Sequence, residues 1–287
     1  MEKPLYPSLE PFNFLGLDEQ NYQNSKVVIF PVPYSSTTYW KSGTKDGPQA
    51  IIDASRHIEL YDIETKKDPS KEGIFTLEFL EPSKNSPEET IGRIKSVMDK
   101  LLADGKFPVM LGGEHSIALG AITAFKEKFA DFSVLQIDAH TDLRDEFEGT
   151  KFHHACVMKR VKDTGLSITR VGVRSMSEEE AEYIKNKKIK NIFLAPELPI
   201  GEIISTLKEN VYLTFDLDAL DPSIMPAVGT PEPGGLGWYE TLNLIKEVAR
   251  KRKIIGADVV ELDPIPGFAA PDFLAAKLVY KIINYIL

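Results

Sequence analysis

Three short apolar segments of this chain each run directly into carboxylate or imidazole side chains. This pattern limits the possible folds more than any other feature of the sequence. Strands are predicted at 107–111, 132–138 and 211–217, and the groups at or after their ends are His115, Asp138 and Asp216. Ligands of open parallel α/β sheets bind beyond the carboxyl ends of the strands. One shared site at that edge therefore explains all three endings.

The second of these strands ends in an unusual run, in which Asp138, His140 and Asp142 alternate with small residues. In a straight strand, residues four apart lie about 13 Å from each other. On a helix, residues two apart point to different faces. The three side chains can meet only if the strand ends near Asp138 and the chain then bends. A polar loop without further function is the alternative interpretation.

Strands and helices alternate along most of the chain. Further strands are predicted at 26–32, 168–173, 190–194 and 254–260, with one or two edge strands in 58–80. Helices are predicted at 46–55, 87–103, 116–129, 154–163, 177–187, 201–209, 238–251 and 270–286. This alternation predicts a single three-layer α/β/α domain with a mostly parallel central sheet. We expect that domain to span residues 25–287, preceded by an N-terminal arm, 1–24, which lies on the domain or on a neighbouring subunit.

The charge balance and the cysteine content narrow the classes of partner and compartment. The net charge is −9, from 34 basic and 43 acidic residues. This disfavours nucleic acids and membrane surfaces as partners and suits a cationic small molecule. The single cysteine, Cys156, excludes an internal disulfide and favours a reducing compartment. With no apparent signal peptide or apolar span of sufficient length, the expected location is the cytoplasm.

Histidines and aspartates are concentrated at the predicted strand ends. Four of the five histidines fall between residues 115 and 154. A lone histidine is more often structural than a ligand, but several imidazoles and carboxylates held together would repel or desolvate badly without a cation. Four carboxylates and two imidazoles suit a pair of divalent first-row ions, which would lower the pKa of a bridging water. The predicted ligands are His115, Asp138, His140, Asp142, Asp216 and Asp218.

Five segments, spread over nearly the whole length, match motifs that occur in the same order in one known family. They are Gly43–Pro48 (G-x-x-x-G-P), Gly112–Ser116, Asp138–Asp142, Phe215–Pro222 and the glycine-rich Gly229–Leu236. In these motifs the chain resembles the ureohydrolases, the arginase and agmatinase superfamily of dimanganese enzymes. The resemblance implies an arginase-like fold, two Mn²⁺ ions per chain (with Co²⁺ or Ni²⁺ as alternatives) and a homo-oligomer, either a trimer or a hexamer.

The resemblance also implies roles for individual residues. One metal ion would take His115, Asp138, Asp142 and Asp216, and the other Asp138, His140, Asp216 and Asp218, so that Asp138 and Asp216 bridge. A hydroxide bound to the metals would attack the guanidinium carbon, and His154 would protonate the leaving amine, releasing urea. His153 stays a second candidate for this proton shuttle, and Cys156 is expected to be a packing residue.

The expected substrate contacts are Glu261 on the guanidinium, His154, Asp145 and Glu232. Glu261 also ends the predicted strand 254–260, although a surface acid just past a strand is its alternative reading.

Two departures from the arginase pattern bear on the substrate. Residues 143–149 carry three acids in place of a polar cluster, and Ser175 stands where arginases have an acid. Both features resemble agmatinase, because acids at a cleft mouth repel a carboxylate and attract a protonated amine. The expected substrate is agmatine or aminopropyl-agmatine, cleaved to urea and an amine (putrescine or spermidine) in polyamine biosynthesis.

Other readings stay open. Arg144 leaves room for a carboxylate-bearing guanidino or formimino compound, as in an arginase, a guanidinobutyrase or a formiminoglutamase. A catalytically silent metal-binding relative and a deacetylase-type amidohydrolase with one zinc ion are more distant alternatives. The number of bound metal ions and the release of urea would separate these readings.

Overall fold

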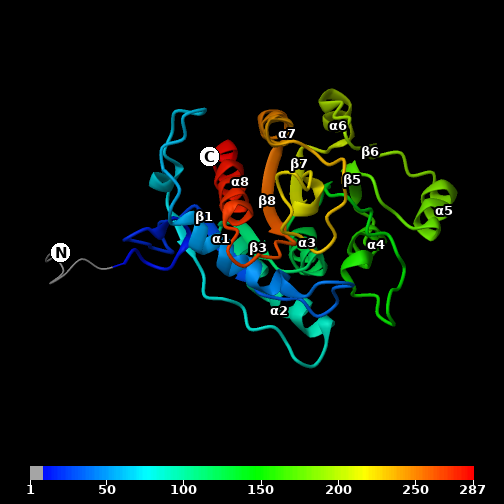
Figure 1. Cartoon of the computed structure of the whole chain (residues 1–287), viewed down its shortest axis with the longest axis horizontal. Helices are drawn as coiled ribbons and strands as arrows, with labels where there is room; N and C mark the ends of the chain where they lie inside the picture. The colour runs from blue at the N-terminus through cyan, green and yellow to red at the C-terminus, as the bar shows by residue number, and fades with distance from the viewer. Residues whose placement is uncertain (1–8) are drawn as a thin grey trace, which may run out of the picture.

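The chain builds one eight-stranded sheet in which every paired strand runs parallel to its neighbour. The computed structural model describes residues 9–287. The strand order is β2-β1-β3-β8-β7-β4-β5-β6, and Figure 1 shows the strands from β1 on the left to β6 on the right. The strands are β1 (Val27–Val32), β2 (Ile74–Thr76), β3 (Phe107–Gly112), β4 (Ser133–Ile137), β5 (Ser167–Val173), β6 (Ile192–Leu194), β7 (Asn210–Asp216) and β8 (Lys253–Val260).

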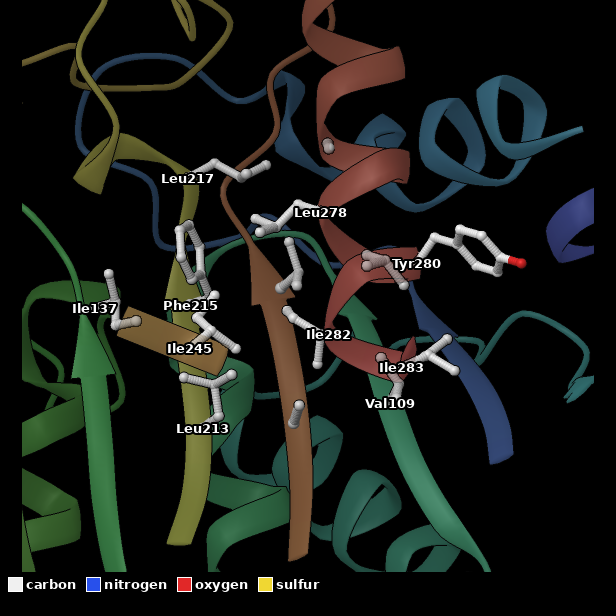
Figure 2. Close-up of a cluster of buried hydrophobic side chains, with 14 of the residues drawn as sticks. Val109, Ile137, Leu213, Phe215, Leu217, Ile245, Leu278, Tyr280, Ile282 and Ile283 are labelled. Carbon is white, nitrogen blue, oxygen red and sulfur yellow. The ribbon is translucent and has the colours of Figure 1, made fainter. Parts of the chain in front are cut away.

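Helices cover both faces of the sheet. They are α1 (Gly47–Ser55), α2 (Pro87–Ala103), α3 (Ala118–Lys128), α4 (Val157–Asp163), α5 (Glu178–Lys187), α6 (Ile200–Thr206), α7 (Trp238–Lys251) and α8 (Ala270–Ile286). One buried apolar cluster joins α1, α6, α7 and α8 to the sheet, and a second joins α2, α3 and α4. Figure 2 shows the first of these clusters, where α8 side chains such as Leu278 and Ile282 pack over β8 and its neighbours. The predicted three-layer α/β/α fold is therefore confirmed.

Element boundaries differ from the prediction mainly where polar motifs meet helices. The helix predicted at 116–129 begins as a 3₁₀ turn, His115–Ile117, and continues as α3. The helix predicted at 154–163 likewise starts with a 3₁₀ turn, His154–Cys156. Both turns lie at the carboxyl edge of the sheet, where their side chains take part in the site described below. Of the one or two edge strands predicted in 58–80, the structure has one, the short β2, preceded by a 3₁₀ turn at Pro69–Glu72.

The described part of the N-terminal segment packs closely on the sheet. Phe14 and Leu15 are buried within the first apolar cluster, and the Leu15 N–H donates to Ser55 Oγ at 2.8 Å. Residues 9–24 thus lie on the domain, while 1–8 fall outside the described residues. The boundary predicted between an arm, 1–24, and a domain, 25–287, stays a prediction. Within residues 9–287, no helix has the length and apolar character to cross a bilayer.

The sheet order brings the polar strand ends together. β3, β8, β7 and β4 are neighbours, and parallel strands end at the same edge of a sheet. His115, Glu261, Asp216 and Asp138 lie at or just beyond the ends of these strands in that order. A side chain at Gly113 would place its Cβ only 1.9 Å from the Tyr34 carbonyl oxygen. Only glycine therefore allows the chain to turn there and present His115 to the edge.

Candidate metal centre and adjoining cleft

Backbone N–H groups orient the aspartates at this edge. The His140 N–H donates to Asp138 Oδ1 at 2.6 Å, and the Asp218 N–H donates to Asp216 Oδ1 at 2.9 Å. The Ala139 N–H donates to Asp218 Oδ1 at 3.0 Å. Each of these carboxylates therefore has one oxygen held by the main chain, and its other oxygen faces a histidine ring.

A first group of ligand-type atoms surrounds His115. The ring atom Nδ1 lies 3.1 Å from Asp138 Oδ2, 3.1 Å from Asp142 Oδ2 and 3.4 Å from Asp216 Oδ2. All of these side chains are buried. Asp142 adopts a left-handed backbone conformation with φ of 52°, which turns its carboxylate back toward Asp138. The bend predicted after Asp138 is thus present, and β4 ends at Ile137.

The hydrogen bonds behind His115 determine which ring nitrogen is free. His115 Nε2 lies 2.8 Å from Thr214 Oγ1, and the Thr214 hydroxyl donates to Asp258 Oδ1 at 2.6 Å. Since that hydroxyl proton is already used, Thr214 can only accept a proton from Nε2. The lone pair of Nδ1 is then directed at the carboxylates, and Nδ1 has no hydrogen-bond partner among the described residues. A cation is the group that fits this position.

A second group forms around His140 and shares Asp138 with the first. His140 Nδ1 lies 2.8 Å from Asp218 Oδ2 and 3.7 Å from Asp138 Oδ1. The nitrogen and oxygen atoms of Asp138, His140 and Asp218 can converge on one ion, as can those of His115, Asp138 and Asp142. The structure therefore brings all six predicted ligands together, with Asp138 common to both groups.

The electrostatics of the cluster support cation binding. Burial and the neighbouring Asp142 and Asp218 raise the pKa of Asp138 to about 7. Burial also raises the pKa of Asp216 well above its usual range. Burial alone would lower the pKa of His140, but the Asp218 charge outweighs it and raises this pKa to about 11. Without a metal ion, protons must supply the positive charge that the acids require, so the residues present fit a dinuclear divalent metal centre.

Glu261 and His154 lie next to the first group. Glu261 Oε1 accepts a hydrogen bond from the His115 N–H at 2.7 Å and lies 3.3 Å from His154 Nδ1. Glu261 has a left-handed backbone conformation, with φ of 69°, an unfavourable state for a non-glycine residue that is often found at functional sites. Burial opposes the charge on His154, but the bond to Glu261 outweighs it and raises the His154 pKa to about 9.

His153 is placed quite differently from His154. Its ring is buried, and its Nδ1 accepts the Ala155 N–H at 3.2 Å. Burial and the nearby His154 charge lower its pKa to about 3, so the ring is neutral. The ring also stands edge-on to Phe147, with centroids 4.8 Å apart. His153 therefore supports the loop, whereas His154 faces the cleft.

A cleft of about 450 Å³ opens above the metal groups. Its inner wall carries acids and imidazoles, and its outer wall carries mainly aromatic and apolar groups. The inner residues are His140, Asp142, His154, Glu180, Asp216, Asp218 and Glu261, and the outer ones include Tyr39, Arg144, Phe147 and Met176. A volume of this size holds a small linear molecule.

The three acids of the loop 143–149, which were expected at the cleft mouth, do not line the cleft. Asp145 bonds to Arg160 and lies 3.4 Å from Lys159 Nζ, and it does not line the cleft. Both cations come from α4, which draws this carboxylate outward. Glu232 Oε1 lies 3.9 Å from His140 Nε2, at the edge of the second metal group. From the segment 143–149, Arg144 and Phe147 line the cleft instead of the three acids.

Arg174 holds together two loops that border the cleft. Its guanidinium donates to carbonyl oxygens on both sides, including Asp218 O at 2.7 Å and Glu232 O at 2.7 Å. Further acceptors are the carbonyl oxygens of Gly172, Ala219, Leu220 and Pro233. The planar fork of arginine can serve such a ring of acceptors, which a single ammonium cannot.

Replacement of Arg174 by Met is expected to lower the free energy of unfolding by about 2–4 kcal/mol, since several carbonyl groups would lose a charged donor. Equilibrium denaturation in urea measures this loss. Arg93→Met, at a helical arginine with a 41% exposed side chain, is the control and should change stability by less than about 0.5 kcal/mol. Equal effects of the two substitutions would contradict the role assigned to Arg174.

Several residues of the site are absent from the sequence predictions, although some of them stand out in the sequence. Asp258 and Thr214 are polar residues within otherwise apolar strands, which is unusual unless they serve a neighbouring group. Tyr212 also donates to Asp258, at 2.8 Å. Glu180 lines the cleft and accepts hydrogen bonds from Thr141 and from the Leu143 N–H. Its role could not be read from the sequence, because it is equally suited to cap its own helix.

Fold and site together define a parallel α/β protein with a candidate dinuclear metal centre at the carboxyl edge of its sheet. The Arginase family profile matches residues 25–284. The N(1)-aminopropylagmatine ureohydrolase of Synechocystis sp. is 40% identical over 92% of this chain and 90% of its own length. The agmatinase of Halalkalibacterium halodurans is 34% identical over 86% of this chain and 87% of its own length.

A solved structure agrees with these sequence relatives. The crystal structure of the agmatine ureohydrolase of Thermoplasma volcanium superposes with a TM-score of 0.86 and 34% identity, covering 97% of this chain and 94% of the other. The chain belongs to the arginase family. The assignment to the ureohydrolase superfamily and its arginase-like fold, made from the sequence motifs, is thereby confirmed.

Proposed function

We propose that this protein is a metal-dependent ureohydrolase that cleaves the guanidino group of agmatine or N1-aminopropylagmatine to urea and an amine. The amine product would be putrescine or spermidine, which places the reaction in polyamine biosynthesis. The observation that carries the proposal is the pair of ligand groups sharing Asp138 beneath a cleft that also holds Glu261 and His154. The names of the relatives agree with this substrate class.

The proposed metal ligands are those that lie together in the cluster. One ion would be held by His115, Asp138, Asp142 and Asp216, and the other by Asp138, His140, Asp216 and Asp218. Carboxylate-rich ligation favours Mn²⁺, with Co²⁺ or Ni²⁺ as alternatives. When bound, two such ions supply an activated water at neutral pH and stabilise charge that develops on the substrate.

Glu261 is the proposed receptor for the guanidinium. It lines the cleft, is 5% exposed, and keeps its carboxylate beside the metal groups through the His115 N–H. Carboxylates pair with guanidinium donors through parallel hydrogen bonds, and the low exposure of this site strengthens such a pair. Glu261 would therefore hold the guanidino carbon above the metal centre and leave the aliphatic tail in the outer cleft.

His154 is the proposed proton donor to the leaving amine. It faces the cleft beside Glu261, and with a pKa of about 9 it carries a proton at neutral pH. An amine leaves far more readily once its nitrogen is protonated, which is the task of a general acid. Glu232, at 3.9 Å from His140, stays a proposed contact at the rim. Asp145 is not among the proposed substrate contacts, because it pairs with Arg160 and does not line the cleft.

One observation favours a second candidate function. Arg144 lines the cleft, and a guanidinium there could receive the carboxylate of arginine or guanidinobutyrate. The inner cleft is otherwise rich in acids, and this favours a cationic tail. The two candidates differ only in the charge at the end of the tail, so a direct comparison of substrates separates them.

Release of urea from Mn²⁺-loaded protein tests the proposal. Agmatine, N1-aminopropylagmatine, arginine and guanidinobutyrate would be compared at equal concentration, with chelator-treated protein as the control. We expect kcat/KM for the amine-ended substrates to exceed that for the carboxylate-bearing ones by at least about 100-fold, since a misplaced charge costs several kcal/mol. Faster hydrolysis of guanidinobutyrate or arginine would establish the second candidate. No urea from any of the four would contradict the proposed activity.

We also propose that the protein acts in the cytoplasm as a homo-oligomer, a trimer or a hexamer. The single cysteine supports a reducing compartment. Exposed apolar side chains, among them Ile63 at 85% and Tyr239 at 83% exposure, supply surface for contacts between copies. Light scattering coupled to gel filtration measures the mass, and a monomer of about 32 kDa would contradict the oligomer.

A further inference from the structure

The outer half of the cleft has an aromatic wall formed by Tyr39 and Phe147. Their ring centroids lie 5.7 Å apart, and both residues line the cleft. They come from two separate loops, residues 33–42 after β1 and residues 143–153 after β4. None of the acids proposed to bind metal or guanidinium belongs to this wall. A substrate whose guanidino group is held by Glu261 would therefore extend its tail toward this aromatic wall.

Phe147 is firmly positioned. Its N–H and carbonyl both bond to Thr150, each at 3.0 Å, across a tight turn in which Glu148 and Gly149 have φ of 47° and 78°. Positive φ at both central residues is the signature of a type I′ turn. The buried, neutral ring of His153 supports the Phe147 ring from its edge. The wall is thus preformed. Because the His153 ring is neutral, it does not repel a cation bound at the Phe147 face.

Arg144 already places a cation on this wall. Its guanidinium carbon lies 4.5 Å from the Phe147 ring centroid. Within residues 9–287, the Arg144 side chain makes no hydrogen bond or ion pair, although its backbone N–H donates to Ala155 O at 3.1 Å. An arginine in an acidic protein normally finds a carboxylate. Among residues 9–287 the Phe147 ring is the partner of the Arg144 guanidinium, so this ring face attracts a cation at a position that lines the cleft.

From these contacts we propose that Tyr39 and Phe147 form the binding subsite for the aminopropyl extension of a polyamine substrate, and that Arg144 covers this subsite until substrate displaces it. The inference rests on the proposed function. The extension adds three methylene groups and a second ammonium to the tail of agmatine. Methylene groups pack on aromatic rings, and an ammonium binds the ring face in the way that the guanidinium of Arg144 does. The wall is therefore a specificity determinant for the longer substrate.

The competing reading is that Arg144 receives a substrate carboxylate. The observations favour the aromatic subsite, because the Arg144 guanidinium lies against the Phe147 ring. A receptor arginine is usually oriented by hydrogen bonds to nearby carbonyl or carboxylate groups, as Arg174 is in this chain. Arg144 has no such bonds among the described residues.

The test compares kcat/KM for N1-aminopropylagmatine with kcat/KM for agmatine in four Mn²⁺-loaded proteins. These are the wild type, Phe147→Leu, Arg144→Gln and Phe79→Leu. Phe147→Leu retains apolar volume and removes the ring face, so the ratio should fall about fivefold. Arg144→Gln removes the competing cation, and the ratio should rise about two- to fivefold. Phe79→Leu is the matched control, since Phe79 is 37% exposed, packs on Phe12 and lies outside the cleft.

The ratio separates recognition of the tail from general damage to the loop. Damage near His154 would slow both substrates equally and leave the ratio unchanged. An unchanged ratio in both Phe147→Leu and Arg144→Gln, with urea still released, would overturn the aromatic subsite without touching the proposed function. Loss of guanidinobutyrate hydrolysis in Arg144→Gln would overturn the aromatic subsite and show that Arg144 is a receptor for the substrate carboxylate. Failure of the wild type on both amine-ended substrates would instead be a failure of the proposed function.

Discussion

Replacement of Asp138 by Asn is expected to lower kcat/KM for urea release by at least about 1000-fold. Asp138 belongs to both ligand groups, so both proposed ions lose a negatively charged ligand at once. The charge stabilisation supplied by a metal centre amounts to several kcal/mol, and about 4 kcal/mol corresponds to a factor of 1000. Asn has nearly the same volume and can still accept the His140 N–H, so the fold should persist.

Metal content provides a readout that is independent of activity. Elemental analysis after gel filtration should find two Mn²⁺ ions per wild-type chain and at most one in Asp138→Asn. Asp145→Asn is the matched control, because this carboxylate pairs with Arg160 and does not line the cleft. It should keep both ions and nearly all activity. Full metal content and activity in Asp138→Asn would show that the ligand groups are assigned wrongly.

Substitution of His154 by Gln should reduce kcat by about 100- to 1000-fold, the usual contribution of a general acid. Gln can still bond to Glu261 but cannot donate a proton to the leaving amine. The wild-type proton donor is active in its protonated form, and its pKa is raised to about 9. Activity that depends on this group is therefore retained below pH 9 and is lost as the pH rises through that value. The variant should lack this decline at high pH.

His153→Gln is the informative control for the shuttle. His153 accepts the Ala155 N–H and contacts Phe147, so its loss should affect stability more than the pH profile. Added imidazole should partly restore the activity of His154→Gln and have little effect on His153→Gln. The opposite pattern would assign the proton shuttle to His153, the second candidate from the sequence.

Much of the fold could be predicted because the hydrophobic pattern is local and regular. The apolar runs that became β3, β4, β7 and β8 are buried on both faces of a parallel sheet, and such strands consist largely of apolar residues. The helix predicted at 87–103 agrees with α2 at both ends. Ser86 accepts the Glu89 N–H there and Pro87 stands at the first position, and both are start signals that can be read from sequence alone.

Errors in the fold arose where tertiary contacts determine the conformation. The 3₁₀ turns at His115 and His154 follow from bonds to distant residues, such as that between the His115 N–H and Glu261. The arm predicted at 1–24 was expected to lie on the domain or on a neighbouring subunit, and only the structure shows that Phe14 and Leu15 pack into the apolar cluster beside α1. Periodicity over a few residues contains no information about a partner that is 40 or more positions away.

The sequence by itself determined the chemistry of the inner site. The residue types at the strand ends, together with the rule that parallel strands finish at one edge, identified all six side chains that the structure brings together. Glu261 could be placed beside them on the same argument. The number of acids and imidazoles was enough to infer a cation, because buried like charges cannot remain together without one.

Only the tertiary structure decided which groups face the outer cleft. In the sequence, Asp145, Glu146 and Glu148 outnumber Arg144, and the loop looks acidic. In the structure Asp145 turns to Arg160 and Lys159 on α4, while Arg144 lies on Phe147 and lines the cleft. The direction of a loop side chain depends on the charges and rings that distant segments place beside it. The position of a side chain at a strand end, by contrast, is determined by the sheet to which the strand belongs.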